Sequence, residues 1–140
     1  MPMTIRRLLT ERWTGRTSEA RHVKRGDIWT VSGGGGYAGK PRPVVIVQDD
    51  SFDATDSITV CAFTTDPTDA PLFRLAIEPN GRNGLRAPSR LMVDKITTVS
   101  KTKVGERIGR LDDEDVVRLG RAVVVFLGLA VSPRAGGKEE

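Results

Sequence analysis

The sequence predicts a mainly β fold, a compact and strongly bent antiparallel barrel followed by one C-terminal helix. Short runs rich in β-branched residues alternate with turn signals from residue 23 onward. Helical spacing of apolar residues is clearest in one segment, after residue 112. The length of 140 residues suits a single domain, so a second independent core is not expected.

Five or six short strands are expected. The run Pro43–Gln48 is nearly continuous in β-branched residues, which is typical of a strand buried on both faces. Two Asn-Gly pairs, at 80–81 and 83–84, predict turns between the fourth and fifth strands. The expected strands span residues 27–31, 43–48, 57–63, 72–77, about 89–98 and about 104–111.

The predicted helix begins after Asp112, which is placed to act as its N-cap, and the acidic residues that follow suit an electropositive helix N-terminus. Gly128 supplies a C-terminal stop. One apolar stripe at helical spacing consists of Val116, Leu119, Val123, Phe126 and Leu127. A second stripe gives the helix more apolar surface than one small barrel covers, so we expect a homodimer; it consists of Val117, Gly120 and Val124.

Composition divides the chain into three regions. Residues 1–22 are a basic N-terminal extension with five arginines and two glutamates, residues 23–131 form the barrel domain, and residues 132–140 are expected to be a disordered tail. Apolar residues of the extension recur at helical spacing, so it is either a short amphipathic helix or a peripheral segment of little consequence. Since the rest of the chain is nearly neutral, local clusters must attract an acidic partner such as RNA.

Several classes of protein are excluded by scarce residue types. The chain has one cysteine, Cys61, and one histidine, His22, so it cannot form an internal disulfide and most zinc and iron sites are ruled out. We therefore expect a reducing, cytoplasmic location and no cofactor or metal ion. No apolar run reaches the ~18 residues of a membrane helix, and the N-terminus lacks the apolar core of a secretory signal, so no membrane association is expected.

The glycine-rich stretch from Gly33 to Lys40 matches two nucleotide-binding patterns, the P-loop and G-x-G-x-x-G. Both patterns require a helix directly afterwards, and the P-loop also requires Ser or Thr after its lysine. Here Pro41 follows Lys40, and the next residues predict a strand. We therefore reject both nucleotide motifs and interpret the stretch as a flexible hairpin loop that can cover a bound polymer.

Three short segments carry chemistry that a phosphate site needs. Arg42 stands between two prolines at the start of a buried strand, where a stiff backbone can fix its guanidinium; the alternative is an ordinary surface arginine. Thr64 and Thr65 place two hydroxyls at the end of the next strand, where they either bind phosphate oxygens or cap a turn. Asp94, beside Lys95 in an apolar strand, is a general base, a ribose ligand or an ion-pair partner.

Together these residues resemble the MazF/PemK family of toxin endoribonucleases. The resemblance covers residues 23–130 and depends on short segments in the family's order and spacing. They are Lys24–Trp29, Gly39–Gln48 with Asp50, Val60–Thr65, Ser89, Val93–Val99, Ile108–Leu111 and Phe126–Leu129. The sequence departs from the family in its Gly-Gly-Gly-Tyr-Ala loop, which bears on cleavage specificity, and in its N-terminal extension.

The resemblance implies an SH3-like barrel of the MazF/PemK/CcdB type with a C-terminal α-helix, assembled as a homodimer. It also implies metal-independent, sequence-specific cleavage of single-stranded mRNA to 2′,3′-cyclic phosphate and 5′-hydroxyl ends, which inhibits translation. By the same resemblance, Arg42 and Thr64 are the catalytic pair. Positions near the RNA groove are Thr65, Ser89, Asp94 and Lys95, with Gly39 and Lys40 in the adjoining loop.

Two further expectations concern partners. The resemblance implies a cognate antitoxin, whose acidic, partly disordered segment would occupy the RNA groove because carboxylates imitate phosphates. Some relatives with this barrel poison DNA gyrase and do not cut RNA, so a non-catalytic toxin that binds a protein target is the alternative function. The Arg42–Thr64 pair favours the nuclease.

Overall fold

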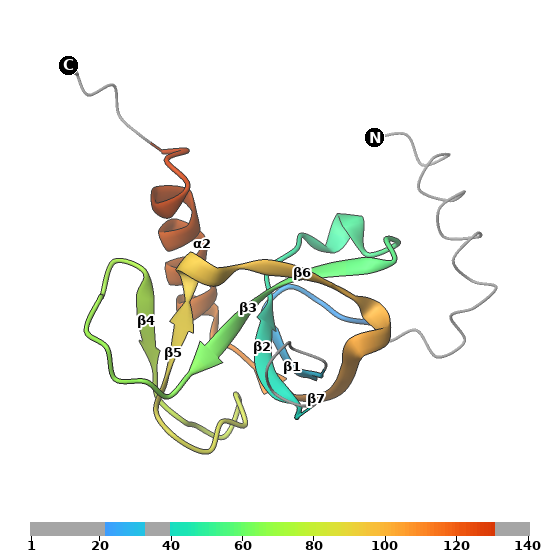
Figure 1. The fold of residues 1–140 in the computed structure, drawn as a ribbon, viewed down its shortest axis with the longest axis horizontal. Helices are drawn as coiled ribbons and strands as arrows, with labels where there is room; N and C mark the ends of the chain where they lie inside the picture. Colours follow the sequence, from blue (N-terminus) through green and yellow to red (C-terminus); the bar gives the residue numbers. More distant parts are fainter. Residues whose placement is uncertain (1–21, 33–39, 131–140) are drawn as a thin grey trace.

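A computed structural model describes residues 22–32 and 40–130 of the chain (Figure 1). Most of the predicted N-terminal extension, the glycine loop at 33–39 and the tail from residue 131 lie outside the described residues.

The described residues form a seven-stranded antiparallel sheet and one long helix, which confirms the predicted mainly β class with a C-terminal helix. The strands are β1 (Asp27–Val31), β2 (Arg42–Ile46), β3 (Ser57–Thr64), β4 (Arg74–Ile77), β5 (Ser89–Met92), β6 (Thr97–Ser100) and β7 (Val104–Arg110). The helix is α2 (Asp113–Phe126), and the short 3-10 turns are η2 (Asp50–Phe52), η3 (Val93–Lys95) and η4 (Lys101–Lys103).

The long strand β3 joins the two halves of the sheet. The strand order is β4-β5-β3-β2-β1-β7, and β6 pairs with β3 as well. Along one edge, β3 pairs with β2; along the other edge, it pairs with β6 through its first half and with β5 at its end. The end of β3 therefore lies between β5 and the start of β2.

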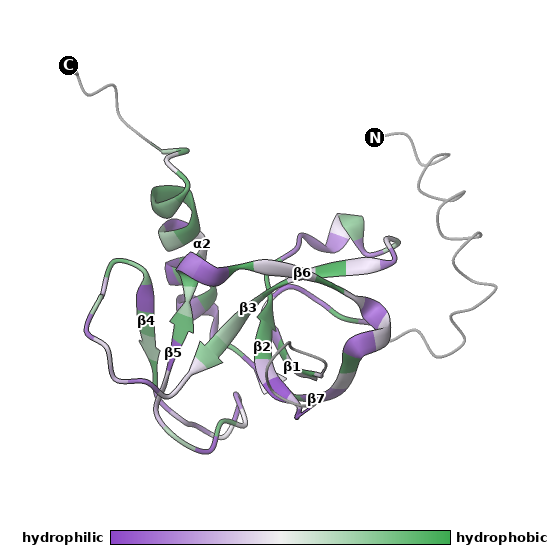
Figure 2. Ribbon diagram, viewed as in Figure 1, coloured by the Kyte–Doolittle hydropathy of each residue, from purple (hydrophilic) through white to green (hydrophobic). Residues whose placement is uncertain are grey.

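Two cores lie on opposite faces of this sheet. The barrel core packs inside β1, β2, β3, β6 and β7 and includes Trp29, Val44 and Ile46. The helix-side core fills the space between the sheet and α2 and includes Val45, Phe63 and Leu91 of the sheet with Leu119 and Ala122 of the helix. Because β2 contributes to both cores, the prediction of a strand buried on both faces is confirmed; the apolar residues along the strands appear green in Figure 2.

The predicted fifth strand, at about 89–98, is wrong as a single element. It consists of β5 and β6 with the 3-10 turn η3 between them. Leu91 pairs with Phe63 and Thr97 pairs with Val60. The chain therefore advances six residues from Leu91 to Thr97 while their partners on β3 are only three residues apart. The surplus residues leave the sheet and form the turn, which places Asp94 and Lys95 in η3 and not in an apolar strand.

The predicted helix is confirmed, but its N-terminus is held in a different way. Asp112 is the N-cap residue, yet its side chain makes no capping hydrogen bond; its carboxylate accepts a hydrogen bond from Asn80 and pairs with Arg82. Gly128 has a positive φ of 73°, as the expected stop at the C-terminus requires. Among the described residues, no helix is both long and apolar enough to span a membrane.

Candidate active site

The β2–β3 pair places Arg42 and Thr64 at the same end of the sheet. The last paired residues of these strands are Val44 and Ala62, and both candidates lie two residues beyond them. Because side chains alternate along a strand, both lie on the face of Val44 and Ala62, opposite to α2. Arg42 is the first residue of β2 and Thr64 is the last residue of β3, and these two strand ends diverge in Figure 1.

The Thr64 hydroxyl is oriented by the loop that follows it. The backbone N–H of Asp66 donates to Thr64 Oγ1 at 3.1 Å. The loop is closed in turn by Thr68, whose N–H and hydroxyl both donate to Asp66 Oδ1, at 3.0 and 2.8 Å. Since Thr64 Oγ1 accepts a hydrogen bond here, the hydroxyl hydrogen remains for donation to another oxygen.

The Asp66 carboxylate lies within the electrostatic reach of two arginines. The hydrogen bonds from Thr68 are the main reason that the pKa of Asp66 is lowered, and the nearby charges of Arg74 and Arg90 lower it further. The charges of Arg74 on β4 and Arg90 on β5 therefore act on the loop that follows β3.

Arg90 is a basic residue beside Thr64 that the sequence did not single out. It is the Cα partner of Thr64 in the β3–β5 pair, and its partner on β4 is Ala76. The strand alternates, with Ser89 and Leu91 buried in the protein and Arg90 on the other face. That alternation in Ser89–Met92 is a signal in the sequence that could have identified Arg90 as a residue of the open face.

Asp94 is held in an ion pair. Arg74 Nε and Nη2 donate to the two carboxylate oxygens of Asp94 at 2.8 and 3.0 Å. This bidentate contact is the main reason that the pKa of Asp94 is lowered, and burial only partly offsets it. A carboxylate stabilised in this way is a weak proton acceptor, so the geometry favours the ion-pair role among the three that the sequence left open.

The other predicted residues are distributed unevenly around this site. Thr65 is exposed directly after Thr64, Lys40 is exposed two residues before Arg42, and Lys95 is exposed on η3. Ser89 is not brought to the same face, because it is buried beside the helix-side core and its hydroxyl donates to the carbonyl of Ala87 at 2.9 Å. Gly39 lies outside the described residues.

Cys61 is buried in the helix-side core, where its side chain is inaccessible. Burial raises the pKa of the Cys61 thiol to about 12, and the negative charge of Asp94 contributes to the shift. The thiol is therefore protonated at neutral pH and cannot serve as a nucleophile. Within residues 22–32 and 40–130, no group of three or more His, Cys, Asp and Glu side chains could hold a metal ion.

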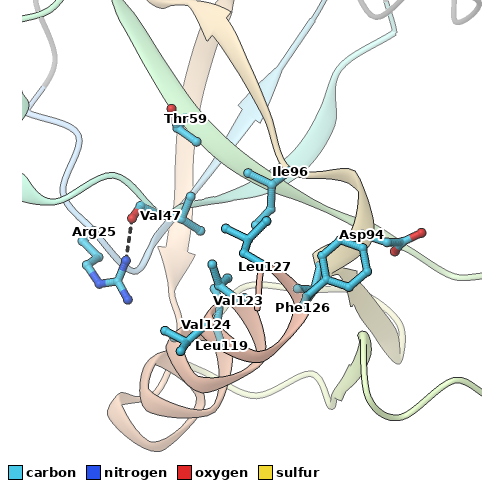
Figure 3. Close-up of a pocket in the computed structure, with 12 residues that line it drawn as sticks. Arg25, Val47, Thr59, Asp94, Ile96, Leu119, Val123, Val124, Phe126 and Leu127 are labelled. Atoms are coloured by element: carbon cyan, nitrogen blue, oxygen red, sulfur yellow. Dashed lines mark hydrogen bonds between the residues drawn. The ribbon is translucent and has the colours of Figure 1, made fainter. Parts of the chain in front are cut away.

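A separate apolar groove of about 730 Å³ runs between α2 and the sheet, on the side of the helix-side core (Figure 3). Its walls come from α2, from η3 with the residue after it, from Val47 just after β2, and from Thr59 near the start of β3. Arg25 closes one side and donates to the carbonyl of Val47. The groove is lined by Arg25, Val47, Thr59, Val93, Asp94, Ile96, Leu119, Gly120, Val123, Val124, Phe126 and Leu127.

Comparison with known proteins gives a consistent result. Residues 24–127 match the model of the PemK-like, MazF-like toxin of type II toxin–antitoxin systems. The chain is 56% identical over 108 residues to a probable endoribonuclease MazF of Mycolicibacterium smegmatis, covering 77% of this chain and 99% of that relative. It is 26% identical over 111 residues to the endoribonuclease EndoA of Bacillus subtilis, covering 76% and 96%.

Solved structures share the fold at low sequence identity. A mycobacterial endoribonuclease in complex with its cognate antitoxin aligns with a TM-score of 0.65 at 22% identity, covering 78% of this chain and 98% of that one. The MazE–MazF complex of Deinococcus radiodurans gives 0.66 at 13% identity, covering 79% and 100%. The match over residues 24–127 and the 56% identical relative show that this chain belongs to the family of PemK-like, MazF-like toxins of type II toxin–antitoxin systems.

Proposed function

We propose that this chain cleaves single-stranded RNA, with the scissile phosphate bound between Arg42 and Thr64. The observation that carries the proposal is their position: both side chains project from the same face at the diverging ends of β2 and β3. One strand end supplies a guanidinium and the other a hydroxyl with a hydrogen to donate.

The reaction uses the 2′-hydroxyl of the RNA as nucleophile. The 2′-oxygen attacks phosphorus, the bond from phosphorus to the 5′-oxygen breaks, and the products carry a 2′,3′-cyclic phosphate and a 5′-hydroxyl. Negative charge develops on the non-bridging oxygens in the transition state. Arg42 supplies positive charge with two parallel hydrogen bonds, and Thr64 donates one more, so the stabilisation comes from groups that the strands already hold in place.

Proton transfer completes the reaction, because the 2′-oxygen loses a proton and the leaving 5′-oxygen gains one. The Asp94 carboxylate is engaged by Arg74 through both oxygens. We therefore assign Asp94 to the positioning of Arg74 and not to the proton-transfer step. We also propose that Thr65, Lys40 and Lys95 contact the RNA around the scissile phosphate. All three are exposed: Thr65 follows Thr64, Lys40 lies two residues before Arg42, and Lys95 lies on η3.

The decisive experiment incubates the purified chain with a long single-stranded RNA in the presence of EDTA. We expect discrete fragments with cyclic-phosphate ends. Arg42→Ala should lower the rate of RNA cleavage at least ~10²-fold while the protein remains folded, because a charged hydrogen-bond donor to the transition state is lost. Cleavage by a well-folded Arg42→Ala protein would remove the assignment, and inhibition by EDTA would contradict the metal-independent mechanism.

The alternative toxin, which binds gyrase and does not cut RNA, is not favoured, because the matched relatives are named as endoribonucleases. The same preparation can test it in a supercoiling assay. We propose the cytoplasm as the location, where mRNA is translated. We also propose an acidic antitoxin segment as the inhibitor, because its carboxylates can bind the arginines that the RNA phosphates would bind.

A further inference from the structure

We infer that Arg90 is a third substrate-binding residue, which holds the RNA phosphate adjacent to the scissile one. The inference rests on the proposed function, because it assigns a second phosphate subsite to the same RNA surface.

The sheet register puts Arg90 one strand away from Thr64. The two residues are direct Cα partners in the β3–β5 pair, and direct partners project from the same face. Neighbouring strands lie about 4.8 Å apart. When one RNA phosphate is bound at Thr64, the Arg90 guanidinium can therefore reach the next phosphate along the RNA.

The surroundings of Arg90 leave room for a ligand. Its partner on the far side is Ala76, an exposed residue with a small side chain, so no bulky group of β4 covers the guanidinium. β5 lies between β3 and β4 and is not an edge strand of the sheet. The charge of Arg90 is consequently not explained as a device against aggregation, which charged residues provide on unpaired edge strands.

The neighbouring charges distinguish Arg90 from Arg74. Arg74 is matched by the bidentate contact to Asp94, with side-chain exposures of 12% and 21%, so its charge is already compensated. The carboxylate of Asp66, in the loop after β3, accepts two hydrogen bonds from Thr68, and the charges of both Arg74 and Arg90 act on it. An RNA phosphate bound by Arg90 would compete with the Asp66 carboxylate for the charge of this arginine.

The test measures binding and cleavage separately. The probe for binding is a short RNA with a single 2′-deoxy nucleotide at the cleavage position, which removes the nucleophile and leaves the phosphates in place. Its Kd is measured over a range of salt concentrations for the wild type, Arg90→Ala and Arg90→Lys. The control is Arg121→Ala, the same change at an exposed residue of α2 on the opposite face of the sheet.

We expect Arg90→Ala to weaken binding roughly tenfold, the size of one charge-assisted hydrogen bond. The slope of log K against log salt should fall by about 0.7, the value for one phosphate contact on a single strand. With the all-ribose RNA, KM should rise while kcat changes little. Arg90→Lys should restore the slope, and Arg121→Ala should match the wild type.

An unchanged salt slope in Arg90→Ala, with normal cleavage by the wild type, would overturn the inference and leave the proposed function standing. A loss of kcat without a change of KM would also overturn it, because that result means a structural effect on Thr64. Should Arg90→Ala fail to fold, Arg90→Gln gives the same readout. Failure of the wild type to cut any RNA would instead contradict the proposed function.

A second variant tests whether the charge of Asp66 competes with RNA for Arg90. Asp66→Asn removes the competing charge while the amide can still accept hydrogen bonds from Thr68. It should tighten binding of the deoxy probe several-fold in the wild type and have little effect in Arg90→Ala. Equal tightening in both backgrounds would show that Asp66 does not act through Arg90 and would count against the subsite.

Discussion

At the scale of single residues, the hydroxyl of Thr64 is the group whose chemistry the structure specifies best. Its oxygen accepts the Asp66 N–H at 3.1 Å, so the direction of its own hydrogen is constrained. Such preorganisation is how a weak donor becomes useful, because no reorientation is needed when charge develops on the substrate.

This arrangement predicts that Thr64→Val lowers the rate of RNA cleavage by about 10²-fold, since valine has the same shape but donates no hydrogen bond. Thr64→Ser keeps the donor and should stay within about tenfold of the wild type. Single-turnover cleavage rates give the comparison. Thr65→Val is the matched substitution at the exposed neighbouring hydroxyl, and a larger loss there than at Thr64 would reverse the assignment.

The resemblance to the MazF/PemK family assigned the catalytic pair to Arg42 and Thr64, where the local sequence left a surface arginine and a turn cap as alternatives. Their catalytic role stays a prediction. The sequence did not single out Arg90, because its place beside Thr64 depends on a pairing between residues 26 positions apart, Thr64 and Arg90. It also grouped Ser89 with the site, although the alternation of β5 turns that hydroxyl to the buried side.

At the scale of elements, the Arg74–Asp94 ion pair joins β4 to η3, the turn that interrupts the expected fifth strand. Strand runs and the helix could be read from periodicity, because β-branched runs and helical spacing are local patterns. The break at η3 could not be predicted from periodicity, because it results from the positions at which β5 and β6 pair with β3. Its residues, Val93 and Ile96 included, are as apolar as those of a strand.

We predict that Asp94→Asn lowers the free energy of unfolding by ~1–2 kcal/mol at pH 7, since it removes a partly buried bidentate contact. The pKa of Asp94 is lowered in the folded protein, so this stabilisation is complete above the ordinary aspartate pKa of about 3.9 and is lost as the pH falls below it. Urea unfolding at pH 7 and near pH 3 should therefore show a difference between wild type and variant that shrinks in acid. Asp113→Asn, at a carboxylate that is 92% exposed, is the control and should change little at either pH.

At the scale of the whole molecule, the described part of the chain leaves a large apolar surface at the end of α2. Among its large apolar side chains, Val125 is 61% exposed, Phe126 46% and Leu127 58%. The ring of Phe126 is half-exposed; its centroid lies 5.9 Å from that of Phe73, and the side chain lines the groove in Figure 3. Contiguous apolar surface of this kind is typical of an interface.

We propose that this groove is where two copies of the chain meet, in the homodimer that the helix pattern led us to expect. A two-fold interface uses the same surface on both copies, so one substitution changes the interface twice. Leu127→Lys should weaken the dimer by roughly tenfold or more, because each copy loses a leucine that the proposed interface would remove from water. A lysine at the C-terminal end of α2 is favourable for the helix itself, so the loss would not come from helix unfolding.

Sedimentation over a dilution series measures the effect. The wild type should have twice the 15.2 kDa chain mass at micromolar concentration, and Leu127→Lys should dissociate at higher concentration. Leu72→Lys is the matched control, because Leu72 is 76% exposed in the turn before β4 and does not line the groove. A wild-type mass that stays at 15.2 kDa while RNA cleavage is complete would contradict the dimer, and equal weakening by both lysines would place the interface elsewhere.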